Sequence, residues 1–192
     1  AHWVRLSSHP KNRGKGEAVM TGCREARAAG FTHVVQIDAD GQHDASDLPR
    51  LLSVSRAQPQ ALVTGIPVYD ASVPRARLYG RYLTHVLVWI HTLSLQIRDS
   101  MCGFRVYPVD TALAVWNQGR VGRRMEFDTE IMVRMFWRGV PVRSVPTRVT
   151  YPADGVSHFH MVRENLRLAW MHLRLLAGMC LRVPRLLWRR PA

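Results

Sequence analysis

Two carboxylates follow a short apolar run at a spacing that suits metal binding. Residues 34–37 have the length and composition of a buried strand, and Asp38 and Asp40 come directly after them at positions i and i+2. If the extended backbone persists, both side chains point to the same side, where they can face one divalent cation. A hard cation held by few carboxylates and by phosphate oxygens is typical of a nucleoside-diphosphate site.

A capping turn and a calcium-binding loop are the two alternatives to this interpretation of the carboxylates. An Asp-rich turn after a strand often caps backbone amides, which explains one carboxylate. It does not explain a second one followed by the polar or backbone-permissive residues Gly41, Gln42, His43 and Asp44 at the mouth of a cleft. A calcium-binding EF-hand loop does not fit, because Gly41 has the wrong offset and position 42 is Gln.

The chain has the size of one domain and the cysteine usage of a reducing compartment. Its 192 residues, of which 47% are apolar, are enough to bury one substantial core. Cys23, Cys102 and Cys180 are odd in number and widely scattered, which argues against a disulfide framework.

The net charge of +13 predicts an anionic partner. It arises from 27 Lys and Arg against 14 Asp and Glu. Nucleic acid, anionic lipid and phosphorylated substrates all suit such a charge, and charge alone does not separate them. The excess of Arg over Lys favours bidentate recognition of phosphate.

The first third of the chain alternates strand and helix patterns. The expected elements are a strand at 2–8, a helix at 17–29, a strand at 32–37, a helix through 48–54 and a strand at 61–65. Gly30 ends the first helix, and Asp44 or Ser46 can cap the second. This order indicates an α/β protein with a mainly parallel sheet.

The middle of the chain continues with less regular patterns. A helix expected at 79–97 is too short, and too interrupted by His85 and His91, to span a bilayer. The elements expected after it are a polar turn at 99–103, a strand at 104–107, a helix at 126–137 and a strand at 140–149.

The pattern of the C-terminal stretch, 161–190, predicts a basic amphipathic helix. At about 100° per residue, its arginines fall within an arc of roughly 100°. They are Arg163, Arg167, Arg174, Arg182, Arg185 and Arg189. Pro184 is expected to break or kink the helix. Its apolar face either packs on the domain or lies on anionic lipid.

Four motifs together resemble the family 2 glycosyltransferases of the GT-A fold. They are Asn12-x-Gly14-Lys15-Gly16, Asp38-Ala39-Asp40-Gly41-Gln42-His43, Asp99-x-x-Cys102-Gly103-Phe104-Arg105 and Glu126-Phe127-Asp128-x-Glu130. Their order and spacing are most similar to the polyprenyl-phosphate type, and residues 151–159 look like bacterial glycosyltransferases of lipid or aryl-polyene gene clusters. The resemblance covers about residues 7–159.

The resemblance implies a GT-A-like, Rossmann-like α/β domain with a mainly parallel sheet flanked by helices. It places a partial glycosyltransferase domain at 1–159 and a basic amphipathic helical extension at 160–192. The family's first two strands, which hold the base and ribose of the nucleotide, find no match here. We therefore expect an N-terminally truncated domain with an exposed sheet edge.

The resemblance also implies a metal site. Asp38 and Asp40 would bind Mg²⁺ or Mn²⁺, with Gln42 as a further oxygen ligand and His158 as a candidate to complete the site. Imidazole is a competent ligand of Mn²⁺. The metal would bind the donor diphosphate and neutralise charge on the leaving nucleoside diphosphate.

Substrate-binding and catalytic roles follow from the same resemblance. Lys15, Asp38, Asp99 and Arg105 are candidate substrate-binding residues, with Arg105 as a bidentate phosphate ligand on the acceptor side. Lys15 is not a Walker A lysine, because the surrounding pattern lacks the required glycine and hydroxyl residues. Asp128 and Glu130 are the candidate catalytic carboxylates; a general base is needed for a hydroxyl acceptor but not for a phosphate acceptor.

The expected function is transfer of a sugar from a nucleoside-diphosphate sugar to a lipid-linked acceptor, either a polyprenyl phosphate or a lipid hydroxyl. We expect a peripheral enzyme on the anionic, cytoplasmic face of a bacterial membrane, without a nucleic-acid partner. A haloacid dehalogenase-like phosphatase is an alternative, although its nucleophile loop normally follows the first strand. A basic anion- or nucleic-acid-binding domain is another, although it leaves the paired carboxylates unexplained.

Overall fold

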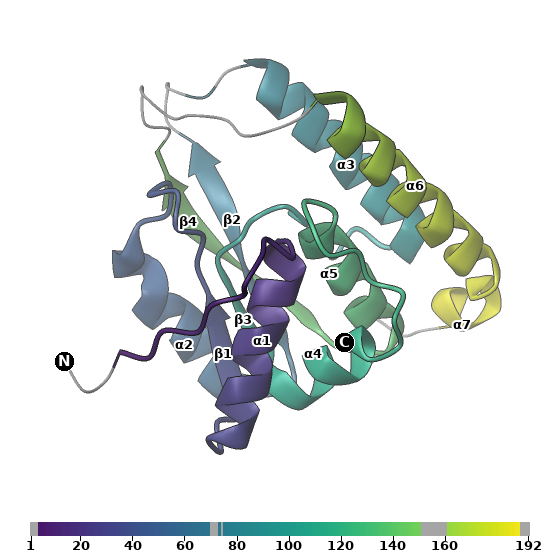
Figure 1. Cartoon of the computed structure of the whole chain (residues 1–192). Helices are drawn as coiled ribbons and strands as arrows, with labels where there is room; N and C mark the ends of the chain where they lie inside the picture. The colour runs from purple at the N-terminus through teal and green to yellow at the C-terminus, as the bar shows by residue number, and fades with distance from the viewer. Residues whose placement is uncertain (1–3, 70–72, 74, 151–160, 189–192) are drawn as a thin grey trace.

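The computed structural model describes residues 4–69, 73, 75–150 and 161–188, and its centre is a four-stranded sheet (Figure 1). The strands are β1 (His33–Gln36), β2 (Leu62–Tyr69), β3 (Arg105–Pro108) and β4 (Val142–Val149), in the spatial order β1-β3-β2-β4. β2 and β4 pair in parallel, whereas β3 is antiparallel to both β1 and β2. Three strands thus run in one direction and β3 runs against them, so the predicted α/β class is confirmed with a mixed sheet.

Helices cover both faces of this sheet. The bounds are α1 (Lys15–Ala28), α2 (Leu48–Ala57), α3 (Arg75–Thr92), α4 (Val109–Trp116), α5 (Phe127–Trp137), α6 (Met161–Cys180) and α7 (Val183–Leu187). The larger apolar core joins α1, α4 and α5 to the sheet and extends to α3 and α6. A smaller core, which includes Leu51, Val63 and Phe104, lies under α2. The site described below lies at the edge of the larger core, where β1 ends.

Several local signals correctly predict where helices begin and end. The side chain of Asp44 accepts a hydrogen bond from the Ser46 amide and caps a 3₁₀ turn, Ala45–Asp47, that leads into α2. Pro184 lies in the first turn of α7, so the C-terminal helix breaks near the expected place. Gly30 has a φ of 84° and follows α1, as its predicted role as a stop requires.

Other predictions differ from the structure. Residues 4–8 form no strand, and among the described residues no strand pairs with the outer edge of β1. The helix expected at 79–97 ends earlier, because Leu93 adopts a φ of 48°. α4 was not expected. The domain boundary predicted at residue 159 lies outside the described residues.

The C-terminal helix packs on the domain along one side of α3. Met171, Leu175 and Met179 of α6 belong to the larger core, and α3 and α6 run side by side at the margin of the molecule (Figure 1). No helix within the described ranges is both long enough and apolar enough to cross a membrane.

Candidate active site at the end of β1

Three charged side chains from distant parts of the chain meet where β1 ends. The Lys15 ammonium donates a hydrogen bond to Asp38 Oδ2 at 2.7 Å and lies 2.5 Å from Asp128 Oδ2. Lys15 begins α1, Asp38 follows β1 and Asp128 lies in the first turn of α5. The fold therefore brings together residues from three of the four sequence motifs.

The glycines around Lys15 allow its helix to approach α5 closely. Gly14 has a φ of 94°, and a side chain there would collide with the Arg123 carbonyl. A side chain at Gly16 would collide with the Phe127 ring, and the Gly16 amide donates to the Arg123 carbonyl at 2.8 Å. The two glycines thus fix where Lys15 enters the site.

Gln36 forms hydrogen bonds with both Asp38 and Asp128. Its amide nitrogen donates to Asp128 Oδ1 at 3.1 Å and to Asp38 Oδ1 at 3.4 Å, and its oxygen accepts from the Tyr107 hydroxyl at 3.1 Å. Sequence reasoning missed this residue. The available signal was a buried polar side chain within an apolar strand, two positions before Asp38, so that alternation places both on the same side.

The pKa of Lys15 reflects this enclosure. Burial lowers the pKa of the ammonium, but attraction by Asp128 and Asp38 outweighs burial, so its pKa is raised from the usual value. Lys15 therefore stays positively charged throughout the neutral range. Asp38, which is 26% exposed at its side chain, remains reachable from solvent while Asp128 is almost enclosed.

The loop after Asp38 carries the other expected metal ligands. Asp40 Oδ1 accepts from the Gln42 amide at 3.1 Å, and the Gln42 carbonyl accepts from the Thr150 amide at 3.1 Å. These hydrogen bonds hold the loop beside the carboxyl end of β4. His158, the fourth expected ligand, lies outside the described residues.

His43 is a second residue that sequence reasoning did not assign to the site. Its ring packs 5.6 Å from the Phe104 ring, and burial lowers its pKa, so the imidazole is neutral at pH 7. Its Nδ1 atom is buried and has no hydrogen-bond partner among the described residues. Both Asp38 and Asp40 are close enough to act on its pKa.

This donor set fits a hard divalent cation. The carboxylates of Asp38 and Asp40 and the side-chain oxygen of Gln42 are oxygen ligands of the kind that Mg²⁺ and Mn²⁺ prefer, and the unpartnered His43 nitrogen lies near them. Within the described part of the chain, however, no three His, Cys, Asp or Glu side chains already converge on one point. A metal would need ligands beyond the carboxylate pair, such as Gln42 or phosphate oxygens.

Arg105, the expected phosphate ligand, lies inside the protein. It has no exposed surface, and its guanidinium donates to the backbone carbonyls of Ser100, Cys102 and Asp128 at 2.6–2.7 Å. A fourth bond, at 3.3 Å, reaches the Tyr107 hydroxyl. Because these bonds use almost all of its donors, Arg105 supports the turn before β3 from inside the protein.

Asp99 is also occupied within the protein. Its carboxylate binds the Arg81 guanidinium through two hydrogen bonds, of 2.6 and 2.8 Å, and accepts from the Met101 and Cys102 amides. Asp99, an expected substrate-binding residue, is only 2% exposed. Its partner Arg81 has a side chain that is 16% exposed.

Glu130, the second candidate catalytic carboxylate, lies inside the protein. It is completely buried; one oxygen pairs with Arg134 at 2.6 Å, and the other pairs with Arg174 at 2.9 Å and accepts from the Gly122 amide at 2.8 Å. It therefore ties α6 to α5, and its oxygens, which we expected to be catalytic, face these internal partners. Sequence spacing cannot reveal this, because Arg174 lies 44 residues away.

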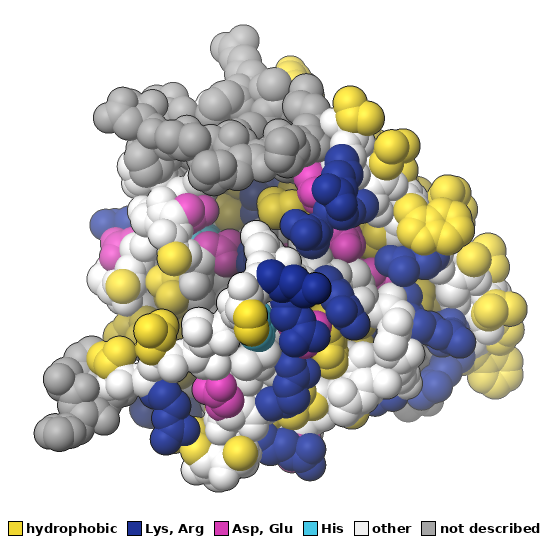
Figure 2. All heavy atoms as spheres, in the orientation of Figure 1, with side chains coloured by type: hydrophobic (Ala, Val, Ile, Leu, Met, Phe, Trp, Pro, Cys, Tyr) yellow, Lys and Arg dark blue, Asp and Glu magenta, His cyan; other side chains and the backbone are white. Residues whose placement is uncertain are grey.

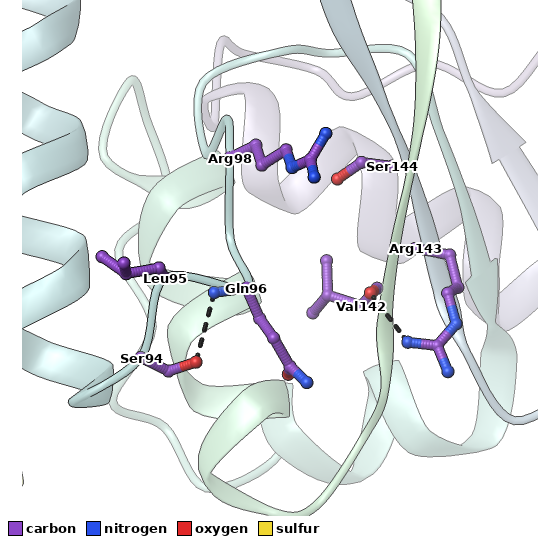
Figure 3. Close-up of a pocket in the computed structure, with 7 residues that line it drawn as sticks. All are labelled: Ser94, Leu95, Gln96, Arg98, Val142, Arg143 and Ser144. Atoms are coloured by element: carbon purple, nitrogen blue, oxygen red, sulfur yellow. Dashed lines mark hydrogen bonds between the residues drawn. The ribbon is translucent and has the colours of Figure 1, made fainter. Parts of the chain in front are cut away.

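A separate pocket of about 500 Å³ opens at the other end of β4 (Figure 3). The loop after α3 and the start of β4 line it with Ser94, Leu95, Gln96, Arg98, Val142, Arg143 and Ser144. None of the residues predicted to form the active site takes part. Arg143 is engaged by Gln58 and points away from the centre of the pocket.

The fold and the carboxylates at the end of a strand define an α/β enzyme domain, and a solved structure shares that fold. The glucosyl-3-phosphoglycerate synthase of Mycobacterium tuberculosis, solved with Mn²⁺, uridine diphosphate and glucosyl-3-phosphoglycerate, superimposes with a TM-score of 0.60 at 15% identity. The match covers 90% of this chain and 57% of that one. This likeness confirms the GT-A-like fold.

The chain belongs to glycosyl transferase family 2, whose family model matches residues 2–112. A dolichyl-phosphate beta-glucosyltransferase of Trichomonas vaginalis is 28% identical over 152 residues, which are 74% of this chain and 44% of that protein. An undecaprenyl-phosphate mannosyltransferase of Micrococcus luteus is 25% identical over 183 residues, covering 86% and 73%. The chain spans about half the length of most of these curated relatives.

Proposed function

We propose that this chain forms the metal- and diphosphate-binding side of a glycosyltransferase that moves a sugar from a nucleoside-diphosphate sugar to a polyprenyl phosphate. The observation that carries this proposal is the meeting of Lys15, Asp38 and Asp128 at the end of β1, beside the loop with Asp40. Family membership supports sugar transfer. The names of the dolichyl-phosphate and undecaprenyl-phosphate relatives support the class of acceptor.

Asp38, Asp40 and Gln42 would hold Mg²⁺ or Mn²⁺ through their side-chain oxygens. When bound, the metal would neutralise the charge that develops on the leaving nucleoside diphosphate. The protein's contribution is to fix the carboxylates in advance. Asp38 is restrained by Gln36, and Asp40 is restrained by its bond to the Gln42 amide.

Asp128 suits a reaction in which the acceptor is already anionic. A phosphate acceptor needs no proton removed, and Asp128 is engaged by Lys15 and Gln36 and lies 3.8 Å from Arg105. These contacts hold Asp128 in place, a positioning role that requires no proton transfer. For a hydroxyl acceptor, Asp128 would instead be the proton acceptor.

We further propose that α3, α6 and α7 form the face that meets an anionic membrane. Exposed apolar residues run in stripes along these neighbouring helices: Tyr79, Tyr82, Leu83 and Ile90 on α3, Val162, Leu166, Trp170 and Leu173 on α6, and Leu187 on α7, with Leu181 and Trp188 flanking α7. Arg163, Arg167 and Arg174 share the adjacent side of α6. Figure 2 shows hydrophobic and basic side chains gathered together over this margin.

This arrangement combines the two alternatives for the C-terminal helix. One side of α6 packs on the domain through Met171 and Leu175, while its exposed stripe offers a surface for lipid. Apolar residues beside arginines bind anionic interfaces by burial of the former and charge attraction of the latter. We propose that this face attaches the protein to the inner face of a bacterial membrane.

Titration of Mn²⁺ followed by UDP-glucose or GDP-mannose tests the proposed site. We expect nucleotide binding to require the metal, and Asp38→Asn/Asp40→Asn to weaken Mn²⁺ binding at least tenfold, because the proposed carboxylate ligands are lost. Asp110→Asn is the matched control, since Asp110 is exposed and pairs only with Arg27 among described residues. Metal-independent binding of both nucleotides, unaffected by the double substitution, would contradict the assignment.

Sugar transfer itself is measured with undecaprenyl phosphate and, in parallel, with a polyprenol. Labelled sugar should enter the lipid phase only with the phosphate acceptor and a divalent metal. Hydrolysis of phosphomonoesters without transfer would favour the phosphatase alternative.

A further inference from the structure

Lys15 is a cation already held within the proposed metal site. Its ammonium lies within hydrogen-bonding distance of Asp38 Oδ2 and Asp128 Oδ2, and so occupies the space between these carboxylates. We infer that Lys15 is a built-in counter-cation that competes with the divalent metal for Asp38 and is displaced toward Asp128 when metal binds. This inference rests on the proposed metal site at Asp38 and Asp40.

The structure fixes the ammonium in this position. Gly14 and Gly16 hold the start of α1 against the Arg123 carbonyl and the Phe127 ring, and these contacts leave the intervening side chain pointing at the carboxylates. Lys15 is half-buried, so its attraction to the carboxylates is less screened than that of a surface pair. The contact of Lys15 with the two carboxylates is therefore fixed by the fold.

Asp38 cannot serve Lys15 and a metal equally well. A divalent cation binds carboxylate oxygen directly, and an ammonium hydrogen-bonded to the same carboxylate brings two positive charges within a few ångströms. Repulsion between these charges lowers metal affinity. Removal of the ammonium also leaves the facing carboxylates Asp38 and Asp128 without their shared cation, which further favours an incoming metal.

Asp128 gives the displaced ammonium a place to remain. It is almost completely enclosed, and Gln36 and Arg105 hold it in position whether or not Asp38 is engaged by metal. In a small shift, the flexible Lys15 side chain therefore loses its contact with Asp38 and keeps its contact with Asp128. The reverse shift restores the Asp38 contact when metal and nucleoside diphosphate leave, which assists product release.

Metal affinity of the whole chain tests this inference without any assay of sugar transfer. Free Mn²⁺ is measured by electron paramagnetic resonance during titration of wild type, Lys15→Met and Lys11→Met. Lys11 and Lys15 are the lysines of the chain, and Lys11 is exposed in the same segment, so its substitution removes the same charge outside the site. We expect Lys15→Met to bind Mn²⁺ at least about tenfold more tightly, or about 1.4 kcal/mol, and Lys11→Met to match wild type.

Lys15→Gln is a second variant with a polar side chain, in case methionine disturbs folding, and it should also bind Mn²⁺ more tightly. Circular dichroism confirms that each variant is folded. Equal or weaker Mn²⁺ binding by the folded Lys15 variants, with wild-type binding intact, overturns the inference while leaving the metal site standing. If neither wild type nor variants bind Mn²⁺, the proposed metal site fails, and the inference fails with it.

Discussion

Asp38 is restrained on several sides by residues that its own motif does not contain. Lys15 binds one of its oxygens, Gln36 approaches the other, and Gly103 lies against the carboxylate so closely that a Cβ atom there would overlap it. A glycine is needed at this position of the Cys-Gly-Phe-Arg turn because any side chain would occupy the space of Asp38, the proposed metal ligand.

Gly103→Ala should weaken Mn²⁺ binding about tenfold or more, because the added methyl group displaces the Asp38 carboxylate from its position. The measurement is the same Mn²⁺ titration, with a parallel denaturant melt. Gly22→Ala is the matched control: it also adds one methyl group, but nothing lies within 4 Å of the new atom. It should leave Mn²⁺ affinity unchanged and raise helix stability by about 0.5–1 kcal/mol. Wild-type affinity in Gly103→Ala would show that Asp38 adjusts freely or does not bind the metal.

The sequence allowed the carboxylates and Lys15 to be proposed as candidates, but not the contacts between them. Spacing within one motif predicts which side chains share a face, whereas the Lys15–Asp128 contact depends on how α1 meets α5. The internal contacts of Arg105 and Glu130 could not be predicted for a related reason. A charged residue in a motif looks the same whether it faces a ligand or, as here, an internal partner far along the chain.

At the scale of elements, α3 and α6 are joined by a buried pair of histidines. His91 Nε2 lies 3.0 Å from His172 Nδ1, and the two rings stack with centroids 5.2 Å apart. Burial lowers the pKa of His91 to about 4 and also lowers the pKa of His172. Both side chains are therefore neutral in the folded protein near pH 7.

Acid should loosen this contact. Since the folded pKa of His91 lies below its unfolded value of about 6.5, the unfolded chain binds more protons, and folding stability falls as pH drops from about 6.5 to about 4. The loss attributable to His91 is on the order of 3 kcal/mol. Urea melts of His91→Phe across this pH range should show a shallower loss than wild type.

The control for this prediction is His33→Phe, because His33 is a partly exposed residue of β1 that contacts Thr32 and Pro59. The stability of His33→Phe should depend on pH in the same way as that of wild type. If His91→Phe shows the full wild-type slope, the acid sensitivity arises from other groups and not from His91.

Most elements could be predicted from apolar periodicity and turn residues, but their pairing could not. The run at 104–107 correctly indicated a strand, yet a four-residue apolar run does not show that β3 lies antiparallel between β1 and β2. Residues 4–8 have strand-like composition and form none, because composition does not provide a neighbouring strand. α4 is too short for its period to stand out.

For the whole molecule, charge and apolar surface favour the same partner. A chain of net charge +13 that exposes apolar stripes on adjacent helices is suited to an anionic lipid surface. The margin formed by α3, α6 and α7 lies on the side of the molecule away from β1 (Figure 1).

Vesicle sedimentation tests the membrane face. The chain should bind phosphatidylglycerol vesicles, bind less at high salt, and bind phosphatidylcholine vesicles weakly. Leu166→Glu/Trp170→Glu should reduce binding to phosphatidylglycerol at least tenfold, because it removes apolar area and adds negative charge. Leu6→Glu, at an exposed leucine near the N-terminus, is the control and should have little effect. Equal loss in both variants would indicate binding by net charge alone.

The separation of Lys15, Asp38 and Asp128 along the chain also orders the events of biosynthesis. A ribosome releases the first two residues, which are 23 positions apart, long before it releases α5. β1 pairs with β3, and the start of α1 is held by the Arg123 carbonyl and the Phe127 ring, so the positions of Lys15 and Asp38 are not fixed until those later residues have been synthesised. The shared contact of Lys15, Asp38 and Asp128 therefore forms late, once the chain up to α5 has left the ribosome.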